Sequence, residues 1–114
     1  IQGDGRARRS YLYGADMATW LWSALAHGGG KNTEPFHIGS EHSVSILELA
    51  QTVATVSGEV LNFVPRVTIA KEIDLSESVH QYVPANSDTR KALQVSEWTS
   101  LAEVIRRTLL HATT

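Results

Sequence analysis

Apolar and polar positions along the chain alternate between helical spacing and short extended runs. After Asp16, apolar residues recur at helical spacing, which predicts a helix capped by Asp16 and stopped by the glycines at 28–30. The face of this helix expected to be buried comprises Met17, Trp20, Leu21, Ala24 and Leu25. Trp22 points elsewhere, and we expect it either to pack on a second layer or to cover a neighbour.

The best-specified element is the helix expected to begin after Ser45. Ser45 and Glu48 form a capping box, and Gly58 is expected to end the helix. Its predicted buried stripe is Ile46, Leu49, Ala50, Val53 and Val56.

Two further helices are expected near the end of the sequence. A small one is predicted over residues 87–93, and a second capping box, Ser100 with Glu103, opens the last one. The inward face of the last helix is predicted to be Leu101, Val104, Ile105, Thr108 and Leu109.

Extended runs separate the predicted helices. They cover residues 10–13, 35–38, 60–64, 67–69 and 81–84, and the polar stretch 71–78 is predicted to be a loop. Three to four helices with short strands give an α/β mixture of the α+β type. The strands are too few for a doubly wound sheet, so no complete Rossmann fold is expected.

Length and composition indicate one globular domain over residues 1–114 with a single core. The chain is 42% hydrophobic and 19% charged, and its formal net charge of −2 argues against a broadly basic nucleic-acid binder. Cysteine is absent, which excludes disulfides, zinc–thiolate sites and a thiol nucleophile. The sequence shows neither a membrane-spanning run nor a signal peptide, and we expect a cytoplasmic protein.

The first residues read like the middle of a longer chain. The sequence begins at Ile1, and IQGDGRARR opens on a glycine turn around Asp4. We therefore expect an excised domain.

An arginine cluster follows that turn. The guanidinium groups of Arg6, Arg8 and Arg9 can converge on a diphosphate through bidentate hydrogen bonds. The alternative is a solvated, frayed terminus, and composition alone leaves both open.

Other motif searches are negative. Gly3-x-Gly5 has Arg8 where a dinucleotide fingerprint needs its third glycine, and no Tyr has a Lys four residues later. His37 and His42 are the closest histidine pair, but their spacing matches no established zinc pattern. We therefore assign no catalytic residue, no metal and no cofactor to these 114 residues.

Four segments in register resemble one enzyme family. They are GDGRARRSYLYGAD at 3–16, FHIGS at 36–40, VSILELA at 44–50 and a C-terminal pattern from Tyr82 to Thr108 that includes RKAL and Trp98. Together they resemble the NAD-dependent epimerase/dehydratase family, extended short-chain dehydrogenase/reductase enzymes acting on nucleotide sugars. The likeness covers nearly the whole chain and is weakest over residues 61–80.

The resemblance implies that this chain is the C-terminal substrate-binding part of an enzyme about three times as long. The Rossmann domain, the catalytic residues and NAD(P) would belong to the part upstream of Ile1, and the parent would be a homodimer. Arg9 matches the family arginine that holds the diphosphate of a nucleotide-diphosphate sugar, and Ser10 and Tyr11 begin the strand that positions it. Arg66 is expected to add a second phosphate contact. No nucleic acid or membrane partner is expected.

The sequence also departs from the family pattern. His37 stands where Asn is common, Glu41 where Gly is common, and residues 94–97 (QVSE) replace the usual Leu-Gly-Trp ending. The sugar and the reaction type stay open for this reason. The rival interpretation is a stand-alone anion-binding or protein-interaction module, with the arginine cluster and Trp22 as its working surface.

Overall fold

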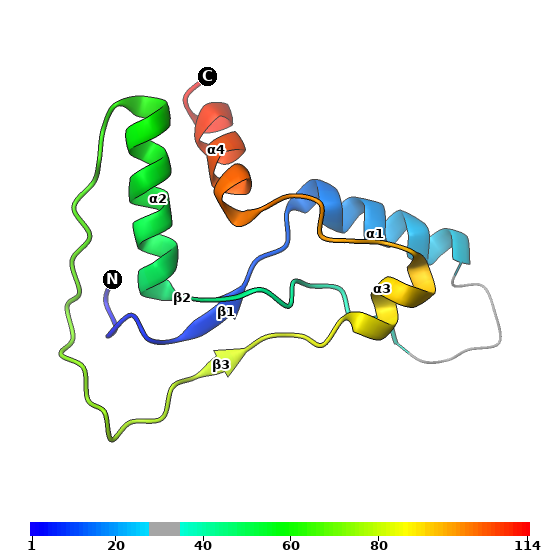
Figure 1. The fold of residues 1–114 in the computed structure, drawn as a ribbon, viewed down its shortest axis with the longest axis horizontal. Coiled ribbons are helices and arrows are strands. Elements are labelled where there is room, and N and C mark those ends of the chain that lie inside the picture. Colours follow the sequence, from blue (N-terminus) through cyan, green and yellow to red (C-terminus); the bar gives the residue numbers. More distant parts are fainter. Residues whose placement is uncertain (28–34) are drawn as a thin grey trace. The chain divides into compact units, whose positions relative to one another are not determined.

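A computed structural model describes residues 1–27 and 35–114 (Figure 1). These residues divide into two compact units. The first unit contains Ile1–Arg9, Val44–Tyr82 and Ser100–Thr114, and the second contains Ser10–Ser43 and Val83–Thr99. The predicted glycine stop at 28–30 lies outside the described residues.

A small sheet carries the arginine-rich segment. Strand β1 (Arg8–Ser10) lies between β2 (Ser43–Ser45) and β3 (Gln81–Tyr82). β1 and β3 are parallel, with Arg8 opposite Gln81 and Arg9 opposite Tyr82. The predicted strand over 10–13 is thus shifted towards the N-terminus, because the hydrogen-bonding partners face residues 8–10.

The glycine turn before β1 allows a close backbone approach. Gly5 is buried with a φ of 78°, and its carbonyl accepts from Leu47 N at 3.0 Å. A Cβ at Gly5 would lie 3.1 Å from Leu47 Cβ. Only glycine combines this left-handed conformation with that approach.

In the first unit, α2 (Ile46–Leu61) packs against α4 (Leu101–Ala112) (Figure 1). The predicted capping box is confirmed, since Glu48 N donates to Ser45 Oγ at 3.0 Å and Ser45 N to Glu48 Oε2 at 2.6 Å. Of the second predicted capping box, the structure shows one half: Ser100 Oγ caps α4 by accepting from Glu103 N at 3.4 Å, whereas the Glu103 carboxylate accepts from Arg107 Nε at 2.7 Å. Ile105 is buried as predicted, whereas Thr108, also predicted inward, is exposed.

The predicted end of α2 is wrong. Gly58 lies inside the helix, which runs on to Leu61 and ends at Asn62 in the left-handed conformation with φ 52°. The extended run expected from residue 60 therefore starts later. A Cβ at Gly58 would lie 2.7 Å from Val64 Cγ2, so this glycine makes room for the returning chain rather than stopping the helix.

In the second unit, α1 (Gly14–His27) packs against α3 (Ser87–Leu93) around Trp20. Trp20 is fully buried with Leu93 and Val95, and its Nε1 donates to Ser96 O at 2.9 Å. The helix over 87–93 matches the prediction.

Two expectations for α1 are wrong. Asp16 is not an N-cap: it lies in the first turn, is buried, and accepts from Thr99 N at 3.0 Å and from Thr99 Oγ1 at 3.2 Å. The predicted stripe is not buried throughout either. Met17, Leu21 and Leu25 are 43%, 46% and 76% exposed, because within this unit only the strip around Trp20 is covered.

Glu97 organises the rest of the second unit. Its carboxylate accepts from Ser40 Oγ at 2.6 Å, Glu41 N at 3.0 Å and Asn86 Nδ2 at 3.1 Å. Asn86 is fully buried, and its backbone N donates to Glu41 Oε1 at 2.6 Å. One carboxylate thus joins the stretch around residue 40 to the start of α3.

The two tryptophans of α1 give a matched test of the core. We expect Trp20→Ala to lower the free energy of unfolding by about 3–5 kcal/mol, since it empties the centre of the cluster. Trp22 is 73% exposed, so Trp22→Ala should change it by less than about 0.5 kcal/mol. Urea unfolding followed by circular dichroism measures both. Equal losses would show that Trp20 is not the centre of the core.

Glu97 gives a pH-dependent test of the network. Burial, the largest single influence, raises the pKa of Glu97, but the hydrogen bonds from Ser40, Glu41 and Asn86 and the nearby His42 together bring it below its ordinary 4.5. A lowered folded-state pKa means stability that is present above about pH 4.5 and lost as pH falls through the folded-state value. We expect Glu97→Gln to cost about 1–3 kcal/mol at pH 7.

The difference between wild type and Glu97→Gln should shrink as the pH falls below 4.5, when the wild-type carboxylate is protonated. Urea unfolding at pH 7, 5 and 3.5 measures it, with Glu72→Gln, which removes an exposed acid, as the control. A difference that stays constant over this range would contradict an ionised Glu97 in the network.

Candidate anion-binding site

Most of the basic side chains in the described part of the chain are paired with carboxylates. The pairs are Arg6–Asp4, Arg8–Glu48, Lys71–Glu77, Arg90–Glu41, Arg106 with Glu59 and Glu103, and Arg107–Glu103. Among described lysines and arginines, those without such a pair are Arg9, Arg66 and Lys91. The first two are the arginines to which the family resemblance assigns a phosphate contact.

Arg9 is held in the sheet with its charge uncompensated. Its Nη1 donates to Arg8 O at 2.8 Å and to His80 O at 3.5 Å, both backbone carbonyls. These bonds orient the guanidinium plane and leave Nε and Nη2 without a hydrogen-bond partner among the described residues. A fixed, partly buried guanidinium with open donors is suited to a phosphate oxygen.

The remaining predicted site residues are Ser10, Tyr11 and Arg66. Ser10 ends β1 and Tyr11 follows it with 41% of its surface exposed. Arg66 lies in the extended stretch after α2, is exposed, and makes no hydrogen bond or ion pair with another described residue. No bond joins Arg66 to Arg9 within the described residues.

The arginine cluster is therefore divided by the fold. Arg6 and Arg8 are engaged in ion pairs, at 2.7 Å with Asp4 and at 3.4 Å with Glu48, whereas Arg9 is not. The three guanidinium groups were expected to converge on one diphosphate. Of the three, only Arg9 has no carboxylate partner among the described residues. Side chains alternate along a strand, so neighbours 8 and 9 leave β1 on opposite faces.

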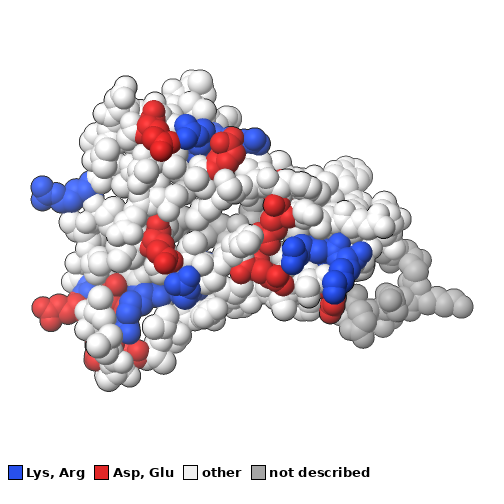
Figure 2. All heavy atoms as spheres, viewed as in Figure 1, with Lys and Arg blue, Asp and Glu red and all other residues white. Residues whose placement is uncertain are grey.

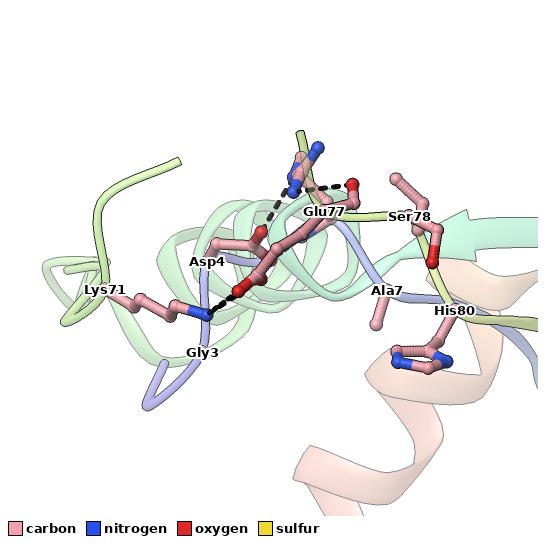
Figure 3. A pocket seen from close by; sticks show the side chains of 9 residues that line it. Gly3, Asp4, Ala7, Lys71, Glu77, Ser78 and His80 are labelled. Carbon is pink, nitrogen blue, oxygen red and sulfur yellow. Dashed lines mark hydrogen bonds and ion pairs between the residues drawn. The ribbon is translucent and has the colours of Figure 1, made fainter. Parts of the chain in front are cut away.

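A pocket of about 520 Å³ lies in the first unit beside Arg6 (Figure 3). Its volume falls within the range of small-molecule sites. The lining residues come from two segments, Gly3, Asp4, Arg6 and Ala7 before β1, and Lys71, Glu77, Ser78, Val79 and His80 before β3. The backbone carbonyl of His80 is also the acceptor for Arg9 Nη1, which connects the pocket to that arginine.

Two ion pairs stand at this pocket. Arg6 Nε donates to Asp4 Oδ2 at 2.7 Å, and Lys71 Nζ to Glu77 Oε2 at 2.8 Å and Oε1 at 3.1 Å. Hydrogen bonds from the Arg6 backbone, and then from its side chain, lower the pKa of Asp4. The hydrogen bond that Lys71 donates to Glu77, followed by the negative charge of Glu77, raises the pKa of Lys71. The Asp4 carboxylate and the Lys71 ammonium are therefore charged at neutral pH.

The sequence alone did not identify this pocket. Lys71 and Glu77 lie in the stretch expected to be a polar loop, and the structure confirms a loop there. Its proximity to residues 3–7 depends on Arg6, whose Nη2 donates to Asp74 O at 2.6 Å and Glu77 O at 3.4 Å. A contact across nearly 70 residues leaves no signal in local spacing.

The face shown in Figure 2 has basic and acidic groups interleaved rather than gathered by sign. This distribution differs from the continuous basic stripe of a typical nucleic-acid interface. None of the described helices combines the length and the apolar character that a membrane crossing requires. The described residues also hold no group of three or more His, Cys, Asp or Glu side chains able to bind a metal ion.

Comparison with solved structures finds one kind of fold. The UDP-N-acetylglucosamine 4-epimerase of Bacillus cereus matches 100% of this chain with a TM-score of 0.78 and 20% identity. The UDP-glucose 4-epimerase of Bifidobacterium longum, solved with NAD⁺ and UDP, matches 99% with a TM-score of 0.76 and 20% identity. That of Thermotoga maritima, with UDP-glucose, matches 99% with 0.73 and 19%.

This chain spans about a third of those proteins, 37%, 34% and 34% of their lengths respectively. No protein-family model matches the sequence, and no curated protein does. The fold expected from the resemblance, a small α/β arrangement matching part of an epimerase chain, is therefore confirmed, and at these identities the similarity establishes the fold alone.

Proposed function

We propose that this chain is the substrate-binding part of an NAD-dependent nucleotide-sugar epimerase or dehydratase, in which Arg9 holds the substrate diphosphate. The observation that carries the proposal is the position of Arg9: it is fixed on the central strand, has open donors, and has no carboxylate partner among the described residues. The shared fold with proteins solved with UDP, UDP-glucose and NAD supports it.

In this proposal the chain does not carry out the chemistry. NAD, bound to the rest of the parent enzyme, oxidises a sugar hydroxyl and later returns the hydride. Arg9 fixes the diphosphate, and fixing one end of the substrate limits the positions that the sugar can take. Arg66, which is also free of an ion pair in the described chain, supplies a second cation. Alone, these 114 residues turn over no nucleotide sugar.

The exposed apolar surface of α1 supports a larger parent. Leu21, Trp22 and Leu25 are 46%, 73% and 76% exposed on one helix. Large apolar side chains gathered on one element indicate a surface that meets another part of a protein. The NAD-binding part, within the two thirds of each epimerase chain that has no counterpart here, is the partner this proposal assigns.

The proposal is tested by titrating the chain with UDP, in calorimetry at low salt. We expect Arg9→Ala to weaken UDP binding about tenfold or more, because charged hydrogen bonds to phosphate are lost. Lys91→Ala is the matched control, since Lys91 is an exposed cation of α3 without an ion pair, and it should leave binding unchanged. Arg66→Ala is expected to have a smaller effect than Arg9→Ala.

Equal behaviour of the Arg9 and Lys91 variants would refute the role of Arg9. Tight, salt-sensitive binding of a simple oligonucleotide would instead favour a stand-alone anion-binding module. NAD-dependent turnover by the 114 residues would contradict their assignment as a binding part only.

A further inference from the structure

The pocket of the first unit contains a cation that the proposed function does not use. Lys71 lines it opposite the Gly3–Ala7 segment, and Glu77, six residues later in the same loop, pairs with it (Figure 3). In Figure 3 the two side chains reach towards each other from separate points of the loop. The pair places a carboxylate on the one lysine of the pocket.

The other ion pair of the pocket is part of its framework. Arg6 and Asp4 are 21% and 17% exposed in their side chains, and the Arg6 backbone N also donates to Asp4 Oδ1 at 3.0 Å. Arg6 further donates to the carbonyls of Asp74 and Glu77. Two of these four bonds hold the backbone of the loop, so a ligand cannot bind the Arg6 guanidinium without releasing the loop.

Lys71–Glu77 differs in every one of these respects. Both side chains are about half exposed, at 52% and 53%, and the bonds at 2.8 and 3.1 Å are the ones Lys71 makes among the described residues. An exposed ion pair of two long side chains contributes little to stability. Breaking it needs a rotation of the Glu77 side chain only, because Arg6 holds the Glu77 carbonyl in place.

The loop around the pair allows this movement. All residues from 71 to 80 are exposed, and Ile73 and Leu75 leave 53% and 86% of their surface in solvent. Its turn is held locally by Asp74, which accepts from Ser76 N at 2.9 Å and Ser76 Oγ at 2.6 Å. No core packing therefore depends on where the Glu77 carboxylate points.

We propose that Lys71 is a phosphate-binding residue of this pocket and that Glu77 is its internal occupant, displaced when a nucleoside diphosphate binds. The inference deepens the proposed function, on which it rests. A carboxylate offers Lys71 a single charge and two oxygens, whereas a phosphate offers more charge and more acceptor oxygens. The phosphate therefore displaces the Glu77 carboxylate from Lys71. The strength of the Lys71–Glu77 ion pair sets the affinity that the phosphate needs to do so.

The test is a UDP titration of four proteins: wild type, Glu77→Gln, Lys71→Ala and the double variant. Glu77→Gln frees Lys71 and should tighten UDP binding about threefold to fivefold, the scale of an exposed ion pair. Lys71→Ala should weaken binding, and in its background Glu77→Gln should gain nothing. Uridine, which lacks phosphate, should show none of these differences.

Glu72→Gln is the matched control. It removes the same charge from the same loop, one residue from Lys71, and Glu72 has no ion pair with a described residue. Its gain should stay below the gain of Glu77→Gln. Equal gains in UDP affinity would show that the overall negative charge of the loop, rather than the Lys71–Glu77 ion pair, limits binding. That result would overturn the inference.

The outcomes separate the two proposals. Wild type that binds UDP through Arg9, with Glu77→Gln no tighter than wild type, overturns the displacement of Glu77 and leaves the proposed function intact. Binding by neither wild type nor Glu77→Gln overturns both. Loss of binding in Arg9→Ala, together with the expected gain in Glu77→Gln, supports both.

Discussion

The second unit depends on one partly buried carboxylate. Glu97 lies between the stretch around Ser40 and the beginning of α3, and three donors from these segments converge on its two oxygens. Without the Glu97 carboxylate, the fully buried Asn86 would lose a hydrogen-bond acceptor for its side-chain amide. Taking a carboxylate partly out of water costs free energy, and only the complete set of hydrogen bonds offsets this cost. α1 and α3 can then close on Trp20 without an unpaired polar group beneath them.

Two departures from the family pattern become one feature in the structure. Glu41, where glycine is common, and Glu97, in the altered ending, both bond to Asn86, and Glu41 N donates to Glu97. Two acids so near each other would repel. Arg90 offsets this repulsion by donating to Glu41 at 3.2 Å and to Asn86 at 2.8 Å. Glu41, Glu97, Asn86 and Arg90 therefore form one connected polar network within the second unit.

Sequence patterns correctly predicted those features of the fold that depend on interactions between residues close together in the chain. The capping box at Ser45 and the helix over 87–93 follow from bonds within a few residues, and both are present. The Asp16 cap failed because the distant Thr99 donates to its carboxylate. The Gly58 stop failed because the helix continues and the chain then returns past Gly58 at Val64, six residues later. The resemblance singled out Arg9. Its lack of a carboxylate partner among the described residues follows from where the fold places the acidic side chains, which local spacing does not predict.

This distribution of acids makes the proposed anion site compatible with a net charge of −2. Carboxylates neutralise the cations that support the fold, such as Arg6 and Arg106, within short distances, so their fields cancel beyond the pair. An anionic ligand is attracted by the cations that have no carboxylate beside them. Among the described residues of the first unit, the cations without a carboxylate partner are Arg9 and Arg66, and the proposed displacement of Glu77 would add Lys71. Local compensation, rather than total charge, therefore decides where a phosphate can bind.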